Sequence, residues 1–433
     1  MNPAERRLKT EHGGINLAWM FGWASWCAWA LVLPLQAASV SMPAAPNGFS
    51  TLPTAPSGFN NSPAPSAPVS GAEGRLLDGF TFTTTLGMTY DSNVTQSPGP
   101  PLAPVESDFF LNLGGTINYQ SKASQLTFGG NYHGMYNQYF SQTDFSGFNQ
   151  GAGVTANYDA GRLTLTGQAG VEFNHGANRN YGSALVDQTT YNAGLTARYR
   201  ISPKTSLTAN FSDSFSTTTG NFNETQNVTL GASALWKYSA LTEFGPGIRS
   251  TYSSQGNGDA RTSIGPTLNV NYKLSTKVSL NSQVGMNFAS YENGGTADPT
   301  FSASIALDYR ASKLWGMNFS LFKDTQADSY GAGQYTDITS IRLAYHRKIR
   351  RATLSLGLNY DTNSYTVAST NSSTPPPTAS PDRNFYSIDG SLGMLILSNT
   401  TYASIFVRYN NQDNGATNSW DGFQSGISIN RSF

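Results

Sequence analysis

The sequence predicts an all-β fold: a transmembrane antiparallel up-and-down β-barrel of about 18 strands, with short periplasmic turns and long extracellular loops. Three observations predict it. Runs of alternating apolar and polar residues recur from Leu77 to the last residue, the connections between runs alternate between short and long, and aromatic residues stand at both ends of the apolar face. Because side chains in a strand alternate between two faces, each run supplies one apolar and one polar face.

The composition fits a membrane barrel and argues against several other classes. Charged residues make up 12% of the 433 residues, well below the roughly 25% usual for soluble proteins. The formal net charge is zero, so no global basic field favours nucleic acid as a partner. The only cysteine is Cys27, in the N-terminal apolar stretch, which excludes disulfides and cysteine-ligated metals from the rest of the chain. We expect no cofactor and no metal.

The first 38 residues are expected to be a signal peptide. Basic residues near the start precede an apolar stretch over residues 17–35, and the small residues Ala37 and Ala38 follow it. The apolar stretch is longer than is typical and contains four tryptophans, so an uncleaved inner-membrane anchor is the alternative.

Residues 39–76 are expected to be a disordered periplasmic linker rich in Pro, Ala and Ser, followed by the barrel over residues 77–433. The segment APNGFS (residues 45–50) is echoed by APSGFN (residues 55–60). A chain of this composition cannot bury a core and forms a semi-extended spacer. Phe49 and Phe59 are alternatively anchor points for a partner or for the barrel mouth.

The strands follow in order after Leu77, and the hairpin over residues 264–288 shows their pattern most clearly. There, Leu268, Val270 and Tyr272 share an apolar face, and polar residues fill the positions between them. The predicted strands cover residues 80–90, 109–119, 126–136, 152–158, 163–173, 191–199, 207–215, 228–238, 244–252, 264–272, 278–288, 301–309, 315–321, 341–345, 354–360, 386–396, 403–409 and 423–433.

Connection length gives the strands a direction. Outer-membrane barrels have short periplasmic turns and longer external loops. The longest predicted outer loop covers residues 363–384, and another covers residues 95–107. The tight turns lie at residues 121–124, 159–161, 201–205, 239–241, 275–277, 311–314, 347–351 and 397–400.

Aromatic residues on the apolar face form two predicted belts, because amphipathic rings favour the level where hydrocarbon meets headgroup. The alternative is a soluble sheet with cross-strand aromatic pairs, but such pairs would not need to form two belts on the same face. The inner belt at the turn ends comprises Tyr119, Tyr158, Tyr199, Tyr238, Tyr272, Tyr309 and Tyr345. The outer belt at the loop ends comprises Tyr90, Tyr136, Phe173, Phe215, Tyr252, Phe288, Tyr360 and Tyr409.

Two segments carry a resemblance to known families. The final strand, FQSGISINRSF, ends on Phe433 and resembles the C-terminal recognition strand of outer-membrane barrels, which implies that the barrel-insertion machinery reads it. The segment Tyr90-Asp91-Ser92-Asn93-Val94 resembles the YDSNV segment of the putative β-barrel porin family that is often linked with exopolysaccharide loci. Residues 360–363 repeat part of that segment, YDTN.

The polar face is expected to line a water-filled lumen, because small hydrated side chains leave space in a barrel this wide. The alternative is that loops or the N-terminal spacer fold inward and close it. The central hairpin contributes Asn269, Asn271, Asn281, Gln283 and Asn287 to this lining.

Charge is segregated along the predicted axis. Acidic residues gather at the external end and basic residues at the periplasmic end. Rings of like charge can set ion selectivity, but basic residues near turns can equally be solvated or contact lipid headgroups. The predicted lumen-lining cations are Arg198, Lys237, Lys273, Arg310 and Arg342.

These features predict a passive channel for small hydrophilic solutes in the outer membrane of a Gram-negative-type bacterium. One alternative is a structural or export-partner barrel associated with surface polysaccharide, and another is a secreted β-protein or adhesin. An enzyme is not expected, because His133 and His175 have no accompanying nucleophile motif. The expected partners are outer-membrane lipid, lipopolysaccharide, the insertion machinery and the solutes. A homo-oligomer is an alternative to a monomer.

Overall fold

The computed structural model describes residues 79–97, 104–178, 184–220, 222–256, 260–275, 277–292, 295–327, 334–367, 382–397, 400–413 and 419–433. The predicted signal peptide, the predicted linker and most of the predicted loop over residues 363–384 lie outside them. Within the described residues the chain forms 18 β-strands and one short 3-10 helix, η1 (Thr143–Phe145).

The strand bounds are β1 (Phe80–Asp91), β2 (Asp108–Lys122), β3 (Leu126–Tyr139), β4 (Gly147–Asp159), β5 (Leu163–Asn178), β6 (Ala184–Arg200), β7 (Thr205–Thr218), β8 (Thr225–Lys237), β9 (Thr242–Gln255), β10 (Arg261–Ser275), β11 (Val278–Tyr291), β12 (Thr300–Ser312), β13 (Trp315–Ala327), β14 (Gln334–Ile349), β15 (Ala352–Val367), β16 (Arg383–Leu397), β17 (Thr401–Asp413) and β18 (Trp420–Ser432).

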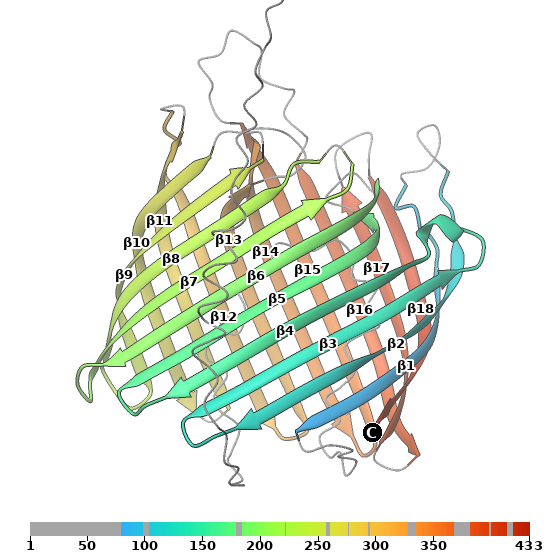
Figure 1. Cartoon of the computed structure of the whole chain (residues 1–433), viewed down its shortest axis with the longest axis horizontal. Helices are drawn as coiled ribbons and strands as arrows, with labels where there is room; N and C mark the ends of the chain where they lie inside the picture. Colours follow the sequence, from blue (N-terminus) through green and yellow to red (C-terminus); the bar gives the residue numbers. More distant parts are fainter. Residues whose placement is uncertain are drawn as a thin grey trace, which may run out of the picture. The chain divides into compact units, whose positions relative to one another are not determined.

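The sheet closes on itself. Each strand pairs with the next one in antiparallel fashion, and β1 also pairs with β18, from Thr83 opposite Ser432 to Asp91 opposite Gln424 (Figure 1). Closure satisfies the backbone groups of both edge strands, which is what allows a sheet to cross a bilayer. The predicted 18-stranded antiparallel barrel is therefore confirmed. Each predicted run falls on one observed strand, although the runs over residues 228–238 and 423–433 extend one residue past the ends of β8 and β18.

The observed strands are longer than the predicted runs. For example, the predicted strand over residues 341–345 is part of β14, and the one over residues 152–158 is part of β4. Apolar alternation marks only the length of strand that faces lipid, whereas backbone pairing continues into the polar ends. Hydrophobic pattern alone consequently underestimates strand length in this fold.

The outward face of the wall is apolar and exposed. Leu86, Leu113, Ile264, Ile405 and Ile427 all point outward with about half of their surface accessible. Soluble monomers rarely expose contiguous apolar patches larger than a few hundred Å². The continuous apolar surface around this barrel therefore suits a lipid environment. No helix in the described part of the chain is long and apolar enough to cross a membrane.

The connections differ at the two ends of the barrel. At one end, the lower end in Figure 1, the turns are short; only Arg350 and Arg351 separate β14 from β15. The connections at the other end are longer, as the sequence predicts. We refer below to the halves of the barrel next to these ends as the short-turn half and the long-loop half.

Candidate functional site

The candidate site is the barrel interior, which the inward-facing residues of each strand build. In the central hairpin, Asn271 lies opposite Asn281 and Asn269 opposite Gln283, in the register that alternation predicts. Asn271, Asn281 and Gln283 are half-buried, and Gln283 Nε2 donates to Asn269 Oδ1 at 3.0 Å. Asn269 and Asn287 are buried, with 7% and 2% of their surface accessible. These two residues offer little surface to an aqueous space.

The short-turn half presents exposed polar side chains to the interior. Asn118, Asn131, Gln168 and Asn318 come from β2, β3, β5 and β13, and all four are exposed. Their amide groups carry both donors and acceptors, so they can hydrate a passing polar solute. This half of the barrel therefore encloses accessible polar surface.

The long-loop half is packed with polar side chains. On its β1–β3 side, Thr89 Oγ1 donates to Asn112 Oδ1 at 2.9 Å, and Asn112 Nδ2 donates to Asn137 Oδ1 at 2.8 Å. All three side chains are buried. Beside them, Phe110 stacks on Tyr139 with ring centroids 4.5 Å apart. The polar network and the stacked rings together form a small core inside the wall.

A second buried region joins strands that are not neighbours in the sheet. Arg249 on β9 forms a charge-assisted hydrogen bond with Asp324 on β13, and Asn287 Nδ2 donates to the other oxygen of that carboxylate at 3.2 Å. In addition, the backbone N–H of Ala327 on β13 donates to Asn227 Oδ1 on β8 at 3.4 Å. We call Arg249, Asp324 and Asn287 the cross-wall cluster.

The cross-wall cluster shows that the wall folds into a tight corner. Strands β10, β11 and β12 separate β9 from β13, so the path along the wall is roughly 19 Å at the usual strand spacing. The side chains nevertheless meet, and Arg249 and Asp324 keep only 10% and 4% of their side-chain surface accessible. Residues inside this corner are almost fully buried: Ser253, Arg261, Ser263 and Tyr335.

Sequence reasoning missed the cross-wall cluster. Arg249 is an inward cation far from the predicted basic end, on a strand whose neighbouring inward positions are the uncharged Gly247 and Thr251. A cation in such a position requires a carboxylate partner if it is buried. The sequence could therefore have indicated that Arg249 has a carboxylate partner. Nothing in the sequence pattern, however, identified Asp324 as that partner.

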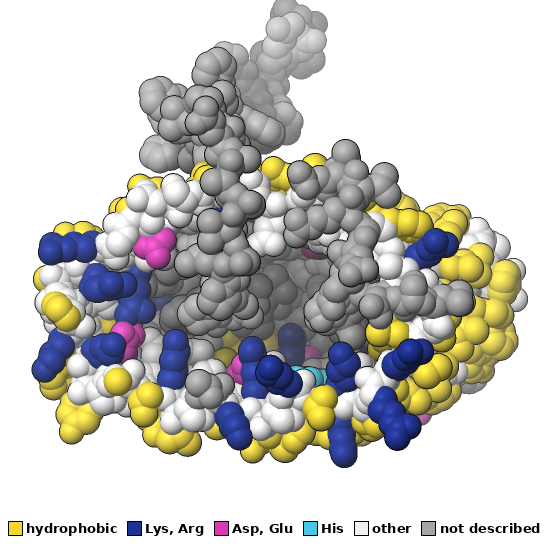
Figure 2. Space-filling model, turned by 90° about the horizontal axis from the view of Figure 1, so that it is seen from below, with side chains coloured by type: hydrophobic (Ala, Val, Ile, Leu, Met, Phe, Trp, Pro, Cys, Tyr) yellow, Lys and Arg dark blue, Asp and Glu magenta, His cyan; other side chains and the backbone are white. Residues whose placement is uncertain are grey.

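The five predicted lumen cations fall into two groups. Arg198 Nη2 contacts both carboxylate oxygens of Glu243 at 2.8 and 2.9 Å, and Arg310 Nη2 lies 3.0 Å from Asp308 Oδ2. Lys237, Lys273 and Arg342 are exposed, and no carboxylate among the described residues lies within ion-pair distance of them. Figure 2, which views the short-turn end, shows Lys and Arg side chains around the rim.

Among the described residues, several of the predicted acidic side chains hold strand ends together at the long-loop end. Asp108 Oδ2 accepts the backbone N–H groups of Ser141 and Gln142 at 2.7 and 2.8 Å. Asp361 Oδ1 accepts the Ser340 hydroxyl at 2.6 Å. Both carboxylates are buried. In the described part of the chain, no group of three or more His, Cys, Asp or Glu side chains could hold a metal ion.

The YDSNV segment fastens β1 to β18. Gln424 Nε2 donates to Asp91 Oδ2 at 2.7 Å, and Asn93 Nδ2 donates to the Asp421 carbonyl at 2.8 Å. Ser92 exchanges two hydrogen bonds with the backbone of Phe423, at 2.8 and 2.9 Å. At its ends, Tyr90 packs on Phe109 outside the wall, and Val94 joins the buried Phe110 and Tyr139. Asp91, Ser92 and Asn93 therefore hold β18 against β1 along what we call the β1–β18 seam, Val94 joins the core beside it, and the Tyr90 side chain packs on β2.

The histidines make local pairs. His133 Nε2 lies 3.1 Å from Glu172 Oε2, and His175 Nδ1 lies 2.6 Å from Asp187 Oδ1. Met135 neighbours this first pair on the same inward face of β3. These contacts fit wall residues that satisfy one another.

The aromatic residues of the predicted inner belt lie near the short-turn ends of their strands. Rings from neighbouring strands contact them: Tyr119 packs on Phe80 with centroids 4.6 Å apart, and Tyr309 meets Trp315 at 5.4 Å. Tyr158, Tyr199 and Tyr238 are exposed, while Tyr272 and Tyr345 are half-buried. At the chain end, the Phe433 N–H donates to the Phe82 carbonyl at 2.9 Å.

No protein-family model matches the chain, and no curated protein matches it. Among solved structures, the outer membrane protein OpdK from Pseudomonas aeruginosa is similar, with 11% identity over 82% of this chain and 100% of that chain and a TM-score of 0.41. OccK9 (OpdG) from Pseudomonas aeruginosa has 11% identity over 82% of this chain and 99% of that chain, with a TM-score of 0.43. OccAB3 from Acinetobacter baumannii has 12% identity over 82% of this chain and 100% of that chain, with a TM-score of 0.39. The likeness is one of fold.

Proposed function

We propose that the protein is an outer-membrane channel through which small hydrophilic solutes diffuse passively. The observation that carries this function is a closed wall with an apolar outer face around an interior with exposed Asn118, Asn131, Gln168 and Asn318. An apolar outside requires lipid, and a hydrated inside supports passage. We place the barrel in the outer membrane of a Gram-negative-type bacterium, with its short turns in the periplasm.

Several partners follow from the same proposal. Phe433 and the strand before it would be read by the barrel-insertion machinery, and lipid with lipopolysaccharide would surround the wall. The five central amides, from Asn269 to Asn287, and the five predicted cations would border the solute path. Because Asn269 and Asn287 are buried, Asn271, Asn281 and Gln283 carry this role in the hairpin.

Conductance across a planar bilayer tests the function. Purified protein should produce stepwise current increments in salt solution, because each inserted barrel adds one aqueous path. Heat-modifiable migration on a gel should first show that the sample is a folded barrel. A folded, heat-modifiable sample that inserts into the bilayer without conducting would contradict the channel.

The YDSNV segment supports a second candidate. We infer membership of the putative β-barrel porin family linked with exopolysaccharide loci, because all five residues are engaged in or beside the β1–β18 seam. In that role the proline-rich arm would dock periplasmic export components. Deleting residues 39–75 should then lower surface polysaccharide while sparing conductance; unchanged polysaccharide would reject it.

A further inference from the structure

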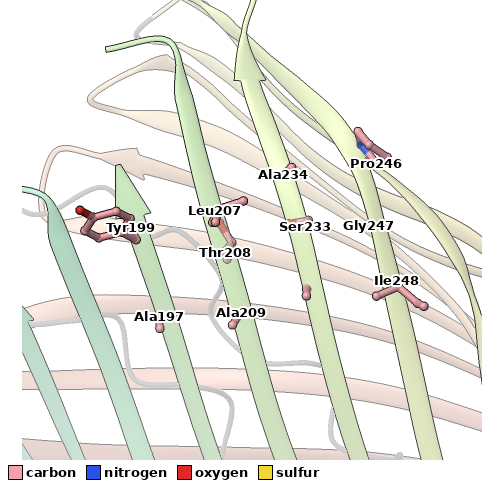
Figure 3. A pocket seen from close by; sticks show the side chains of 11 residues that line it. Ala197, Tyr199, Leu207, Thr208, Ala209, Ser233, Ala234, Pro246, Gly247 and Ile248 are labelled. Carbon is pink, nitrogen blue, oxygen red and sulfur yellow. The ribbon is translucent and has the colours of Figure 1, made fainter. Parts of the chain in front are cut away.

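Two features of the wall lie apart from the exposed polar surface of the short-turn half: an outward groove and the buried inner corner. The groove crosses β6–β9, and Figure 3 shows it between Tyr199 and Pro246. None of the residues that line it is charged, so the groove has no group that selects one ligand from the surrounding lipid. The corner differs, because beyond Arg249 toward the long-loop end it contains a second buried arginine, Arg261.

Arg261 belongs to a group of four inward-facing side chains on β9 and β10, which we call the Arg261 square. Arg261 pairs with Ser253, and the next inward pair on the same two strands is Ser263 with Thr251. The Cβ atoms of residues that lie opposite each other in a sheet are about 5 Å apart. All four residues are buried, from 0% of the surface accessible at Ser253 to 5% at Thr251. The square therefore places three hydroxyl groups around one guanidinium, away from water.

Three polar atoms of the Arg261 square have no hydrogen-bond partner in the described part of the chain. They are Arg261 Nε, Ser253 Oγ and Thr251 Oγ1, and all three are buried. Each of these atoms can donate a hydrogen bond. Buried polar groups in folded proteins are nearly always hydrogen-bonded, and those without a protein partner require a water or an ion. The square is therefore a group of buried donors that requires an acceptor.

The charge of Arg261 also requires a counter-charge. Asp324 is engaged by Arg249, and no carboxylate among the described residues lies within ion-pair distance of Arg261. Asp337 on β14 accepts the Thr325 hydroxyl. An arginine side chain does not lose its proton in a protein, so its burial without a counter-charge is strongly unfavourable. The described side chains of the corner thus leave one positive charge uncompensated.

Two tyrosines lie beside the guanidinium. Tyr291 on β11 lies opposite Arg261, and the centre of the Tyr335 ring is 5.9 Å from Arg261 Cζ. The two rings pack on each other with centroids 5.5 Å apart. A cation over an aromatic ring is attracted by the ring, but the ring carries no net charge and leaves the cation charged. The tyrosines therefore help to exclude water from the square and do not replace an anion.

We propose that the Arg261 square binds one small inorganic anion of about the size of chloride, held by Arg261 with the hydroxyls of Ser253 and Thr251. An anion supplies the counter-charge and accepts hydrogen bonds from these donors, whereas a water molecule supplies no charge. The near-complete burial of the square favours a small ion over an organic one. This site goes beyond the channel function and does not depend on it.

The dependence of stability on chloride tests the site. The full-length protein in lipid vesicles is unfolded with urea at constant ionic strength, while gluconate, an anion too large for the square, is replaced stepwise by chloride. A ligand that binds only the folded state stabilises it according to the occupancy of its site. The unfolding equilibrium constant should therefore fall about tenfold for each tenfold rise in chloride above the dissociation constant.

Three variants locate the effect. Arg261→Gln removes the charge and should abolish the chloride dependence. Should that variant not fold, Thr251→Val replaces one hydroxyl with a methyl group of similar volume, and it should raise the chloride concentration that is needed for stabilisation. Arg342→Gln is the matched control, because it removes an inward cation that is exposed and lies outside the square, and the chloride dependence should persist in it.

Three results would overturn the proposal. The first is a stability that does not change with chloride in the unmodified protein. The second is a chloride dependence that Arg261→Gln, or Thr251→Val in its place, leaves unchanged. The third concerns Asp259, which precedes Arg261 by two residues and lies outside the described residues: a chloride dependence that appears only in Asp259→Asn would assign the counter-charge to that carboxylate. Conductance is not a readout here, so failure of the anion site leaves the channel intact.

Discussion

The two halves of the barrel use the same polar residue types in opposite ways. In the short-turn half, inward amides such as Asn118 and Asn131 are exposed. In the long-loop half, Asn112, Asn137 and Asn287 keep only 2% of their surface accessible and bond to one another or to charged partners. The first half offers a hydrated path, whereas the second is a polar core built inside the wall.

This difference indicates where the barrel keeps its stability and where it can bind a solute. Buried polar groups stabilise only when their hydrogen bonds are satisfied, and losing one partner is costly. Exposed polar groups can instead bond to water, so their replacement costs little. Substitutions in the long-loop half should therefore affect folding and pore size, and substitutions in the short-turn half should affect selectivity.

The largest effect is expected for Arg249→Ala. The change leaves the buried Asp324 carboxylate with Asn287 but without its cation, and breaking a buried pair in this way typically costs about 3–5 kcal/mol. Urea unfolding in lipid vesicles, monitored by heat-modifiable migration on a gel, measures the decrease in the free energy of unfolding. Single-channel conductance should also rise, because the contact between β9 and β13 is lost.

Two further variants separate stability from pore size. Arg249→Ala combined with Asp324→Ala leaves no unpaired charge, so it should be more stable than Arg249→Ala alone while conductance stays high. Arg342→Ala removes an exposed cation from the short-turn half and should change stability by less than about 0.5 kcal/mol. Equal stability losses for Arg249→Ala and Arg342→Ala would refute the contrast between the halves.

A matched pair on one strand should give an intermediate effect. Asn137 and Asn131 both point inward from β3, but Asn137 is buried and accepts from Asn112, whereas Asn131 is exposed. Asn137→Ala leaves the Asn112 Nδ2 donor without its partner and should cost about 1–3 kcal/mol. Asn131→Ala should cost less than about 0.5 kcal/mol. Unfolding midpoints of the two variants in the same vesicles provide the comparison.

Most of the fold could be predicted from the sequence because barrel geometry is local in origin. Alternation sets which face each residue takes, and the connections set strand direction. In the central hairpin, the turn predicted at residues 275–277 joins β10 to β11, and the polar residues that were predicted to share a face, such as Asn271 and Asn281, lie opposite each other. What the pattern could not show is the extent of the strands beyond the lipid-facing residues, as in β14.

The cross-section of the barrel could not be predicted. Asn271 and Asn287 obey the same alternation, yet one is half-buried and the other buried. The difference depends on contacts across the corner of the wall. Asn287 on β11 bonds to Asp324 two strands away on β13, and Asp324 meets Arg249 on β9, two strands from Asn287 on its other side. Such contacts depend on how the closed sheet bends, which no local pattern encodes.

The smallest effect on stability and the clearest effect on selectivity are expected for the exposed cations. Lys237, Lys273 and Arg342 face the short-turn half without a carboxylate partner among the described residues, so they should favour anions. Replacing all three with Gln should shift the reversal potential in a salt gradient toward cation preference. The matched control replaces Arg198 and Glu243 together with Gln, which removes a neutral pair and should leave the reversal potential unchanged. A shift of the same size in the control would mean that paired and unpaired charges act alike, and the assignment of selectivity to the unpaired cations would fail.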